Sequence, residues 1–146
     1  NEMVHIERII QVTDELVRAF ERLMPQLTTF APPPDRDVLG AIVSDPGNNL
    51  FVARASGGEI VGSATLGTFT SPTGTHAWIE DVIVDESWRG QGLGEALTRA
   101  CLDRAAEMGL KEVNLTSRPA REAANRLYQR MGFQRRETNL YRYPLK

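Results

Sequence analysis

The sequence predicts an α+β fold in which a mixed, mostly antiparallel central sheet carries helices on both faces. Three β-rich runs follow one another between residues 50 and 84 and are joined by glycine-containing turns, as in an antiparallel meander. Helical patterns precede and follow these runs along the chain. Because the 146 residues contain no repeat and no long linker, one domain over residues 1–146 is expected.

Ten elements are expected in chain order. They are a strand at 4–9, helices from Thr13 to about 24 and from Asp35 to 43, strands at 50–55, 59–68 and 76–84, a helix at 92–108, a strand at 111–116, a helix at 120–131 and a strand at 133–143. Thr13 and Asp35 are N-cap residues ahead of apolar helical patterns, and Pro25 ends or bends the first helix. The proline-rich connector at 28–34 cannot continue a helix, and we expect this helical pair to form a lid or wall over a site.

The strands are predicted from alternation and from the turns between them. The sequence Ser56-Gly57-Gly58 is a hairpin signal between the first two β-rich runs. In residues 76–84 both alternating faces are apolar, so this strand should be central and covered on both sides. Residues 111–116 alternate as a further strand, and Gly109 and Gly132 end the last two helices.

Composition and charge exclude several classes of protein. With 41% hydrophobic and 25% charged residues, the chain is not expected to be disordered, collagen-like or a disulfide scaffold. Lysine and arginine total 17 against 19 acidic residues, which argues against a nucleic-acid partner bound through a large basic surface. No apolar run approaches the ~18 residues of a membrane span, so no membrane partner is expected. The lone Cys101 stands at an apolar helical position, which indicates a core residue of a cytoplasmic protein. No metal is expected, because His5 and His76 have no metal-ligand spacing.

The most informative segment is the glycine-rich run from Arg89 to Gly94, between the buried strand and the longest helix. Glycines allow a ligand to approach the backbone closely, and the N–H groups and dipole at a helix N-terminus attract phosphate. The segment therefore predicts a pyrophosphate site. It lacks the Gly-Lys-Ser/Thr ending of a Walker A loop, and Glu95 stands where a dinucleotide fingerprint needs glycine.

Two motifs together resemble the GNAT superfamily of N-acetyltransferases. The first, Arg/Gln-x-x-Gly-x-Gly/Ala, begins at Arg89, and the second, Tyr-x-x-x-Gly-Phe, begins at Tyr128. The resemblance covers the chain from about residue 50 onward. It implies an acyltransferase that uses acetyl-CoA to acetylate a primary amine by direct attack in a ternary complex. It also implies that the sheet splays between its fourth and fifth strands, here 76–84 and 111–116, to admit acetyl-CoA.

The same resemblance implies which residues bind acetyl-CoA. Backbone groups of the buried strand would pair with the pantetheine arm, and amides of the glycine loop would hold the pyrophosphate. The expected cofactor-binding residues are Val82, Ile83, Val84, Arg89, Gly90, Gln91, Gly92, Leu93, Gly94, Glu95 and Asn125. Many relatives place asparagine seven residues before the tyrosine, where this chain has Arg121, so substitution by Asn125 and a contact from Arg121 to a cofactor phosphate are both open.

Acetyl transfer from a thioester to an amine needs a neutral amine and a proton for the departing thiolate. The resemblance assigns the base to Glu80, directly or through water, and the acid to Tyr128. A phenol with a reference pKa of ~10 can donate a proton at neutral pH. Asp81 and a water chain are alternative bases. Neighbouring side chains of a regular strand point to opposite faces, so Glu80 and Asp81 are not expected to act as a pair.

The acceptor is left open by the sequence. The start of the buried strand, Ile79-Glu80-Asp81-Val82, is similar to that of glucosamine-6-phosphate N-acetyltransferases, but small amines, amino-acid-like compounds and protein amines all fit. Residues 14–43, 69–75 and 141–143 are expected to form the acceptor pocket, which His76 would line from the start of its strand. A non-catalytic CoA-binding regulatory or sensing module and a phosphate-binding nucleotide module are the alternative functions. A homodimer is compatible with the resemblance.

Overall fold

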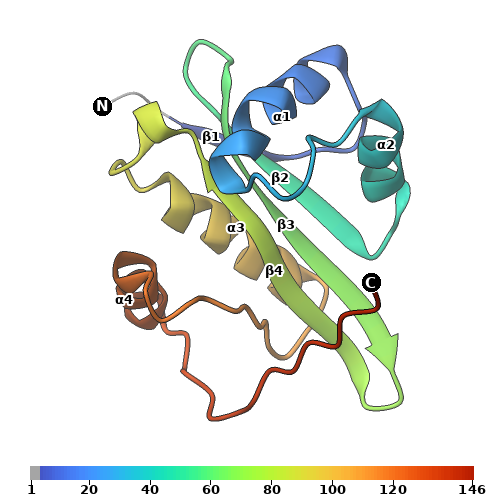
Figure 1. Ribbon diagram of the computed structural model, residues 1–146, viewed down its shortest axis with the longest axis vertical. Helices are drawn as coiled ribbons and strands as arrows, with labels where there is room; N and C mark the ends of the chain where they lie inside the picture. The colour runs from blue at the N-terminus through green and yellow to red at the C-terminus, as the bar shows by residue number, and fades with distance from the viewer. Residues whose placement is uncertain (1–3) are drawn as a thin grey trace. The chain divides into compact units, whose positions relative to one another are not determined.

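The computed structural model describes residues 4–146, which belong to two compact units. The first, called the N-terminal unit, ends at Leu115, and the second, the C-terminal unit, is Thr116–Lys146. The N-terminal unit holds β1 (His5–Arg8), α1 (Asp14–Leu27), α2 (Arg36–Ser44), β2 (Asn48–Arg54), β3 (Ile60–Ser71), β4 (Gly74–Val84), the 3-10 turn η1 (Glu86–Trp88) and α3 (Leu93–Glu107) (Figure 1). The C-terminal unit contains α4 (Glu122–Met131).

The sheet of the N-terminal unit has the strand order β1-β2-β3-β4, and every neighbouring pair is antiparallel. Two helices cover one face, α1 and α2, and α3 covers the other (Figure 1). Leu50 and Val52 of β2 pack with α1 and α2, while the intervening Phe51 and Ala53 are buried on the opposite face. The predicted fold class, a sheet with helices on both faces, is confirmed.

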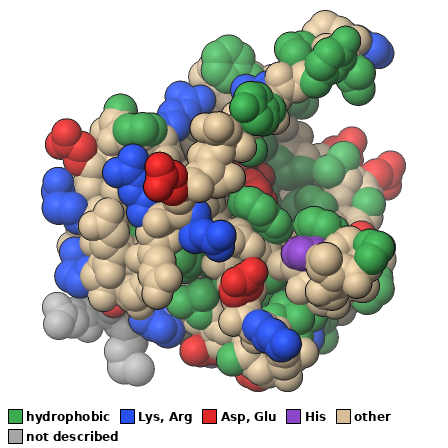
Figure 2. Space-filling model, turned by 90° about the horizontal axis from the view of Figure 1, so that it is seen from below, with side chains coloured by type: hydrophobic (Ala, Val, Ile, Leu, Met, Phe, Trp, Pro, Cys, Tyr) green, Lys and Arg blue, Asp and Glu red, His purple; other side chains and the backbone are tan. Residues whose placement is uncertain are grey.

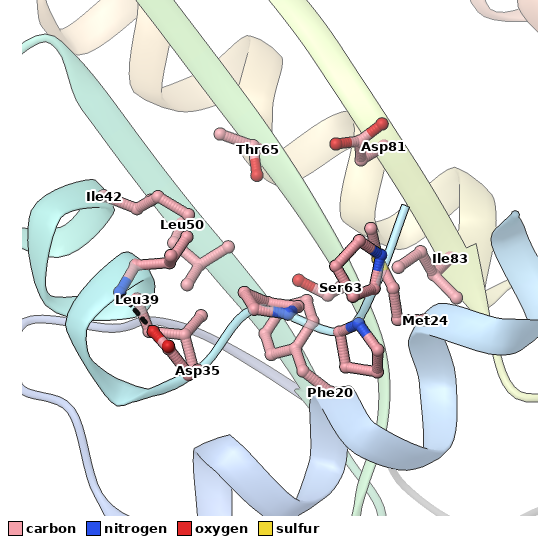
Figure 3. Close-up of a pocket in the computed structure, with 14 residues that line it drawn as sticks. Phe20, Met24, Asp35, Leu39, Ile42, Leu50, Ser63, Thr65, Asp81 and Ile83 are labelled. Carbon is pink, nitrogen blue, oxygen red and sulfur yellow. Dashed lines mark hydrogen bonds between the residues drawn. The ribbon is translucent and has the colours of Figure 1, made fainter. Parts of the chain in front are cut away.

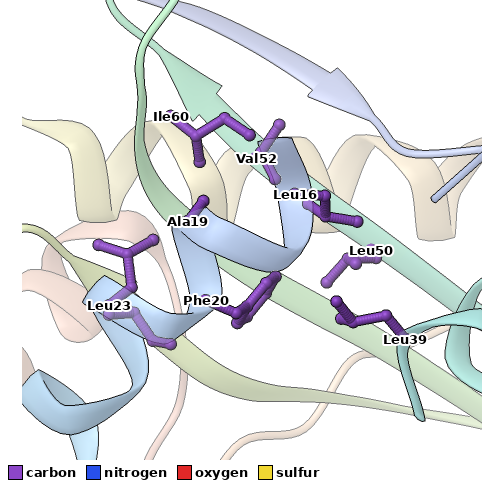
Figure 4. Close-up of a cluster of buried hydrophobic side chains, with 9 residues drawn as sticks. Leu16, Ala19, Phe20, Leu23, Leu39, Leu50, Val52 and Ile60 are labelled. Carbon is purple, nitrogen blue, oxygen red and sulfur yellow. The ribbon is translucent and has the colours of Figure 1, made fainter. Parts of the chain in front are cut away.

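The core on the α1 and α2 face joins both helices to three strands (Figure 4). Its buried members are Leu16, Ala19, Phe20, Leu23, Leu39, Leu50, Val52, Ile60 and Ile83. The predicted caps form as expected: Thr13 Oγ1 accepts from the Leu16 N–H at 3.2 Å, and an Asp35 carboxylate oxygen accepts from the Val38 N–H at 2.9 Å. This packing fixes α1 and α2 against the sheet.

Two predicted strands do not form among the described residues. Residues 111–116 make one parallel bridge, in which the Asn114 N–H donates to the Ala77 carbonyl and the Ile79 N–H donates to the Asn114 carbonyl, each at 2.9 Å. The strand prediction was wrong here because pairing with β4 stops after this single residue. It was also wrong for residues 133–143, since the C-terminal unit contains no strand against which they can pair.

Candidate active site

A β-bulge interrupts β4 in its middle. Thr65 of β3 lies opposite Glu80, and Ser63 lies opposite Ile83, so β4 advances three residues while β3 advances two. Within this stretch Asp81 has φ of 52°, in the left-handed region that non-glycine residues rarely adopt. Backbone of this kind costs about 1–3 kcal/mol and concentrates at functional sites. The bulge and the left-handed backbone of Asp81 therefore make this point of the sheet a candidate functional site.

The bulge also decides which side chains share a face. The register puts Glu80 on the same face as Thr65, which is the face covered by α1 and α2. Asp81 also lines a pocket on this face together with Thr65 (Figure 3). The expectation that Glu80 and Asp81 point to opposite faces assumed a regular strand, and it was wrong because the extra residue shifts the alternation.

The two carboxyl groups influence each other. Burial raises the pKa of Glu80, and the nearby negative charge of Asp81 raises it further. Both residues are exposed to solvent, and neither side chain makes a hydrogen bond or an ion pair with another residue in the range 4–146. A carboxyl group whose pKa is raised is a better proton acceptor near neutral pH than an ordinary one. The pair can therefore attract a cation and take a proton from it.

Among residues 4–115, only Asn114 pairs with the outer edge of β4, and no strand formed by these residues continues along that edge. Just beyond the C-terminal end of β4, the Asp85 N–H donates to the Val61 carbonyl of β3 at 2.9 Å. The N–H and C=O groups of successive residues in an antiparallel strand point alternately to the two sides. Those of Ile83 therefore point toward β3, and those of Val82 and Val84 point outward. Such an edge can accept an extended ligand as an added strand. The Val84 carbonyl already accepts from Arg89 Nε at 3.2 Å.

The glycine loop leads from this edge to an uncapped helix. Gly90 and Gly92 have φ of 79° and 82°, a conformation that side chains disfavour. Gly92 is the N-cap of α3, and no side chain caps it. The first intrahelical bond runs from the Ala96 N–H to the Gly92 carbonyl at 3.0 Å, so the N–H groups of the three residues between them have no acceptor within the helix. Free amides and the helix dipole at such an N-terminus favour the binding of an anion.

The side chains along the loop differ in what they can contribute. Arg89, Gln91 and Glu95 are exposed, whereas Leu93 is buried at 3% exposure. Leu93 can therefore offer a ligand only its N–H group, and its side chain fixes the start of α3 in the core. Gly94 is half-buried against Val84.

Buried Asp85 and the last turns of α1 hold the chain between β4 and the loop. The Asp85 carboxylate accepts from the Ser87 N–H at 3.2 Å and from its hydroxyl at 3.1 Å, and it pairs with Arg22 Nε at 3.5 Å. Burial works to raise the pKa of Asp85, but the Ser87 hydrogen bonds and the Arg22 charge outweigh it and hold the pKa below its usual range. The Glu86 N–H donates to the side chain of Gln26 at 2.8 Å. Sequence reasoning missed the contacts of Arg22 and Gln26 because they join residues about sixty positions apart.

Tyr128 lies on α4 in the C-terminal unit and is half-buried. Its ring meets that of Phe133 edge-on, with the ring centroids 5.6 Å apart. The Phe133 N–H donates to the Tyr128 carbonyl at 2.9 Å across Gly132, which ends the helix as predicted. The Tyr-x-x-x-Gly-Phe motif is thus a helix C-terminal cap that also packs the tyrosine ring.

Asn125 and Arg121 stand at the start of the same helix. Asn125 Nδ2 donates to the Arg118 carbonyl at 2.9 Å, so part of its amide fixes the loop that precedes α4. Arg121 is the N-cap residue, is exposed, and makes no side-chain cap. Its guanidinium and the Asn125 carbonyl oxygen remain available for a ligand.

Two other side chains singled out from the sequence have structural roles. Cys101 is fully buried, as predicted, and burial raises its pKa to about 12, so the thiol is a poor nucleophile. His76 Nε2 lies 2.8 Å from Ser71 Oγ and 3.0 Å from Thr73 Oγ1, and its ring stacks on Phe69. His76 therefore belongs to the tip of the β3–β4 hairpin.

A pocket of about 410 Å³ opens beside the bulge, between the sheet and the α1–α2 region (Figure 3). Its lining residues come from α1, the proline connector, α2 and three strands: Phe20, Met24, Pro32, Pro33, Pro34, Asp35, Val38, Leu39, Ile42, Leu50, Ser63, Thr65, Asp81 and Ile83. The helical pair predicted to wall a site does form one side of this pocket. Residues 69–75, which were also expected to form part of the acceptor pocket, are not among its lining residues.

On the face seen in Figure 2, basic and acidic side chains are both present among uncharged ones, in keeping with totals of 17 and 19. In the part of the chain that the structure describes, no helix is both long and apolar enough to cross a bilayer. No group of three or more His, Cys, Asp or Glu side chains in that part is arranged to hold a metal ion.

Comparison with known proteins agrees with this geometry. The model of the Acetyltransferase (GNAT) family matches residues 12–133. The chain belongs to the GNAT acetyltransferase family. It is 33% identical over 101 residues to N-acetyltransferase 8 of Rattus norvegicus, covering 68% of this chain and 45% of that protein. It therefore spans less than half the length of that relative. It is also 31% identical over 113 residues to aminoglycoside N(6')-acetyltransferase type 1 of Stenotrophomonas maltophilia, covering 71% and 72%.

The fold of this GNAT chain is shared with solved acetyltransferases. The crystal structure of a Trypanosoma brucei acetyltransferase covers 97% of this chain and 100% of its own, with a TM-score of 0.78 and 28% identity. GNAT enzymes take their acetyl group from acetyl-CoA, and two features of the N-terminal unit have the chemistry that this molecule requires. The amides at the start of α3 suit a pyrophosphate, and the outward groups of β4 suit the amide-containing pantetheine arm.

Proposed function

We propose that this GNAT chain transfers the acetyl group of acetyl-CoA to a primary amine by direct attack in a ternary complex. The observation that carries the proposal is the junction of the open β4 edge with the uncapped N-terminus of α3, separated only by residues 85–92. An extended amide chain that ends in a pyrophosphate matches both features. A cytoplasmic location, in which the lone thiol stays reduced, is part of the proposal.

In this proposal the backbone carries most of the binding. Val82 and Val84 offer outward groups to the pantetheine arm, and Ile83 supports the edge by packing in the core. The loop amides hold the pyrophosphate, and Arg89 adds a positive charge beside it. Asn125 and Arg121 supply further contacts to the pantetheine or phosphate portion. Backbone donors explain how a chain with a net charge of −2 can bind an anionic partner.

Glu80 is the proposed base, acting directly or through one water. It accepts a proton from the amine, whose lone pair forms the new bond to the thioester carbon as the carbon–sulfur bond breaks. The raised pKa of Glu80 and its exposure to solvent support this role. Tyr128 is the proposed acid and gives its proton to the departing thiolate. Burial raises the pKa of Cys101 and makes its thiol a poor nucleophile, so the proposal includes no covalent intermediate on it.

Thiol release from acetyl-CoA with a panel of amines tests the proposed function. We expect amine-dependent release of CoA, with the acetylated amine detected by its mass shift of one acetyl group. The purified chain should need no added metal. Tight binding of CoA without turnover on any amine would contradict the proposal and would favour a regulatory CoA-binding module.

Replacing Tyr128 by phenylalanine tests the acid. Because the ring and its edge contact with Phe133 are kept, the fold should be retained while the proton donor is lost. We expect kcat to fall by more than about tenfold with the Kd for CoA little changed. Unchanged kcat, in a variant with an unaltered melting temperature, would remove Tyr128 from the role of acid.

A further inference from the structure

On the basis of the proposed acetyltransferase function, we propose that the acceptor is an amine with an apolar body. The body occupies the pocket between α2 and the sheet, and Asp81 holds the amino group. The pocket volume of about 410 Å³ lies within the ~300–1,000 Å³ range of small-molecule sites.

The lining of the pocket favours an apolar ligand. Apart from Asp35 and Asp81, its polar side chains are the hydroxyls of Ser63 and Thr65, and it contains no lysine, arginine or histidine. A phosphorylated or carboxylated acceptor would find no cation there. A polyhydroxylated acceptor would exchange its hydrogen bonds with water for few partners, which is unfavourable.

Core residues form the base of this pocket. Phe20, Leu39, Leu50 and Ile83 line it and also belong to the buried cluster of the α1 and α2 face. They are held by packing on several elements, so the surface that they present is preformed. An alkyl or aromatic group placed against them leaves water at about 25 cal/mol per Å² of apolar surface buried. The apolar body therefore supplies most of the binding.

Asp81 is the carboxylate of the pocket that is available to a ligand. The other, Asp35, already accepts from the Val38 N–H at 2.9 Å as the cap of α2. The Asp81 carboxylate makes no hydrogen bond or ion pair with any residue between 4 and 146, and the residue lines the pocket from left-handed backbone. Glu80, the proposed base, is the preceding residue and shares this face of the sheet, so an ammonium group held by Asp81 is near the group that accepts its proton.

A matched panel of amines tests the acceptor class. With saturating acetyl-CoA, kcat/KM is measured for 2-phenylethylamine, hexylamine, glucosamine 6-phosphate and the aminoglycoside neamine. We expect the two apolar amines to exceed the two polar ones by at least about tenfold. Equal or higher kcat/KM for the polar amines would overturn the inference while leaving the proposed function standing.

A charge placed in the pocket wall locates the binding site. Val38 lines the pocket but is 49% exposed, so Val38→Arg adds a cation without disturbing the core. Ala41→Arg is the matched control, since it puts the same charge on an exposed position of α2 that does not line the pocket. We expect Val38→Arg to raise the KM for 2-phenylethylamine about tenfold or more and to leave the KM for acetyl-CoA unchanged. Equal effects of the two variants would overturn the placement.

The variant Asp81→Asn tests the anchor. Asparagine tolerates left-handed backbone as well as aspartate does, so the bulge is retained. For the wild type we expect 2-phenylethylamine to bind at least about tenfold more tightly than 2-phenylethanol, and we expect Asp81→Asn to remove most of that difference. An undiminished preference would overturn the role of Asp81.

Calorimetric titration separates this inference from the proposed function. If no amine is acetylated, the proposed function fails. Binding of 2-phenylethylamine to the wild type that is lost in Val38→Arg would still support an apolar amine site. Absence of binding to the wild type would overturn it.

Discussion

At the scale of single residues, the chemistry of the candidate site depends on one extra residue in β4. A regular strand would separate Glu80 and Asp81 on opposite faces, whereas the bulge brings both to the side of α1 and α2. No local sequence pattern predicts this bulge, because non-glycine residues at positive φ are uncommon and most aspartates in strands are regular. The identities of the two carboxylates were available from the sequence, but their shared face was not.

The replacement Glu80→Gln tests the proposed base through its pH dependence. The pKa of Glu80 is raised, first by burial and then by Asp81, so the base form is lost as the pH falls through a value above that of an ordinary carboxyl group. We therefore expect the acidic limb of the wild-type profile of kcat/KM to disappear in Glu80→Gln, with a rate at least about tenfold lower on the plateau.

The pH profile of kcat/KM for Glu59→Gln is the control, because Glu59 is an exposed glutamate outside the site. An acidic limb that persists in Glu80→Gln would assign it to Asp81 or to another group. Glutamine keeps the size of the side chain, so a loss of structure is not expected to confuse the two outcomes.

At the scale of elements, the sequence predicted those that local signals determine. The caps at Thr13 and Asp35 and the glycines that end α3 and α4 all formed as expected. The strand at 111–116 was overpredicted, because a strand requires a partner over several residues and alternation reports only which side chains are apolar. The contact from α1 to η1 was missed for the same reason, since it joins segments distant in the chain.

The glycine loop gives a prediction that belongs to α3 as a whole. Gly92→Ala places a Cβ on left-handed backbone at the N-terminus of the helix, which costs about 1–2 kcal/mol. The loop must distort to relieve this strain, and the amides that face the ligand move with it. We expect the Kd for CoA, measured by calorimetry, to rise by about 5-fold to 30-fold.

Gly109→Ala is the matched control for this experiment, since Gly109 has φ of 76° just beyond the other end of α3. It should lower the melting temperature in the same way and leave the Kd for CoA unchanged. If both variants weaken CoA binding equally, general destabilisation would account for the effect, and the proposed pyrophosphate site at α3 would be wrong.

At the scale of the whole molecule, composition and length bound the fold but not its internal divisions. The fold class is confirmed, whereas the single domain over residues 1–146 stays a prediction, because the chain packs as two compact units. A net charge of −2 likewise says little about the site, where backbone amides and neighbouring carboxylates determine the local field. Function follows from these local arrangements rather than from the totals.

Stability as a function of pH is a property of the whole molecule, and Asp85 should contribute to its acid side. Because the folded-state pKa of Asp85 is lowered, its stabilisation is present above the ordinary aspartate pKa and is lost as the pH falls through the lowered value. We expect Asp85→Asn to reduce the free energy of unfolding by about 1–3 kcal/mol at pH 7. The difference from the wild type should shrink steadily toward pH 3, as measured by urea denaturation. Asp103→Asn, at an exposed position of α3, should show no such pH dependence, and equal behaviour of the two variants would refute the role assigned to Asp85.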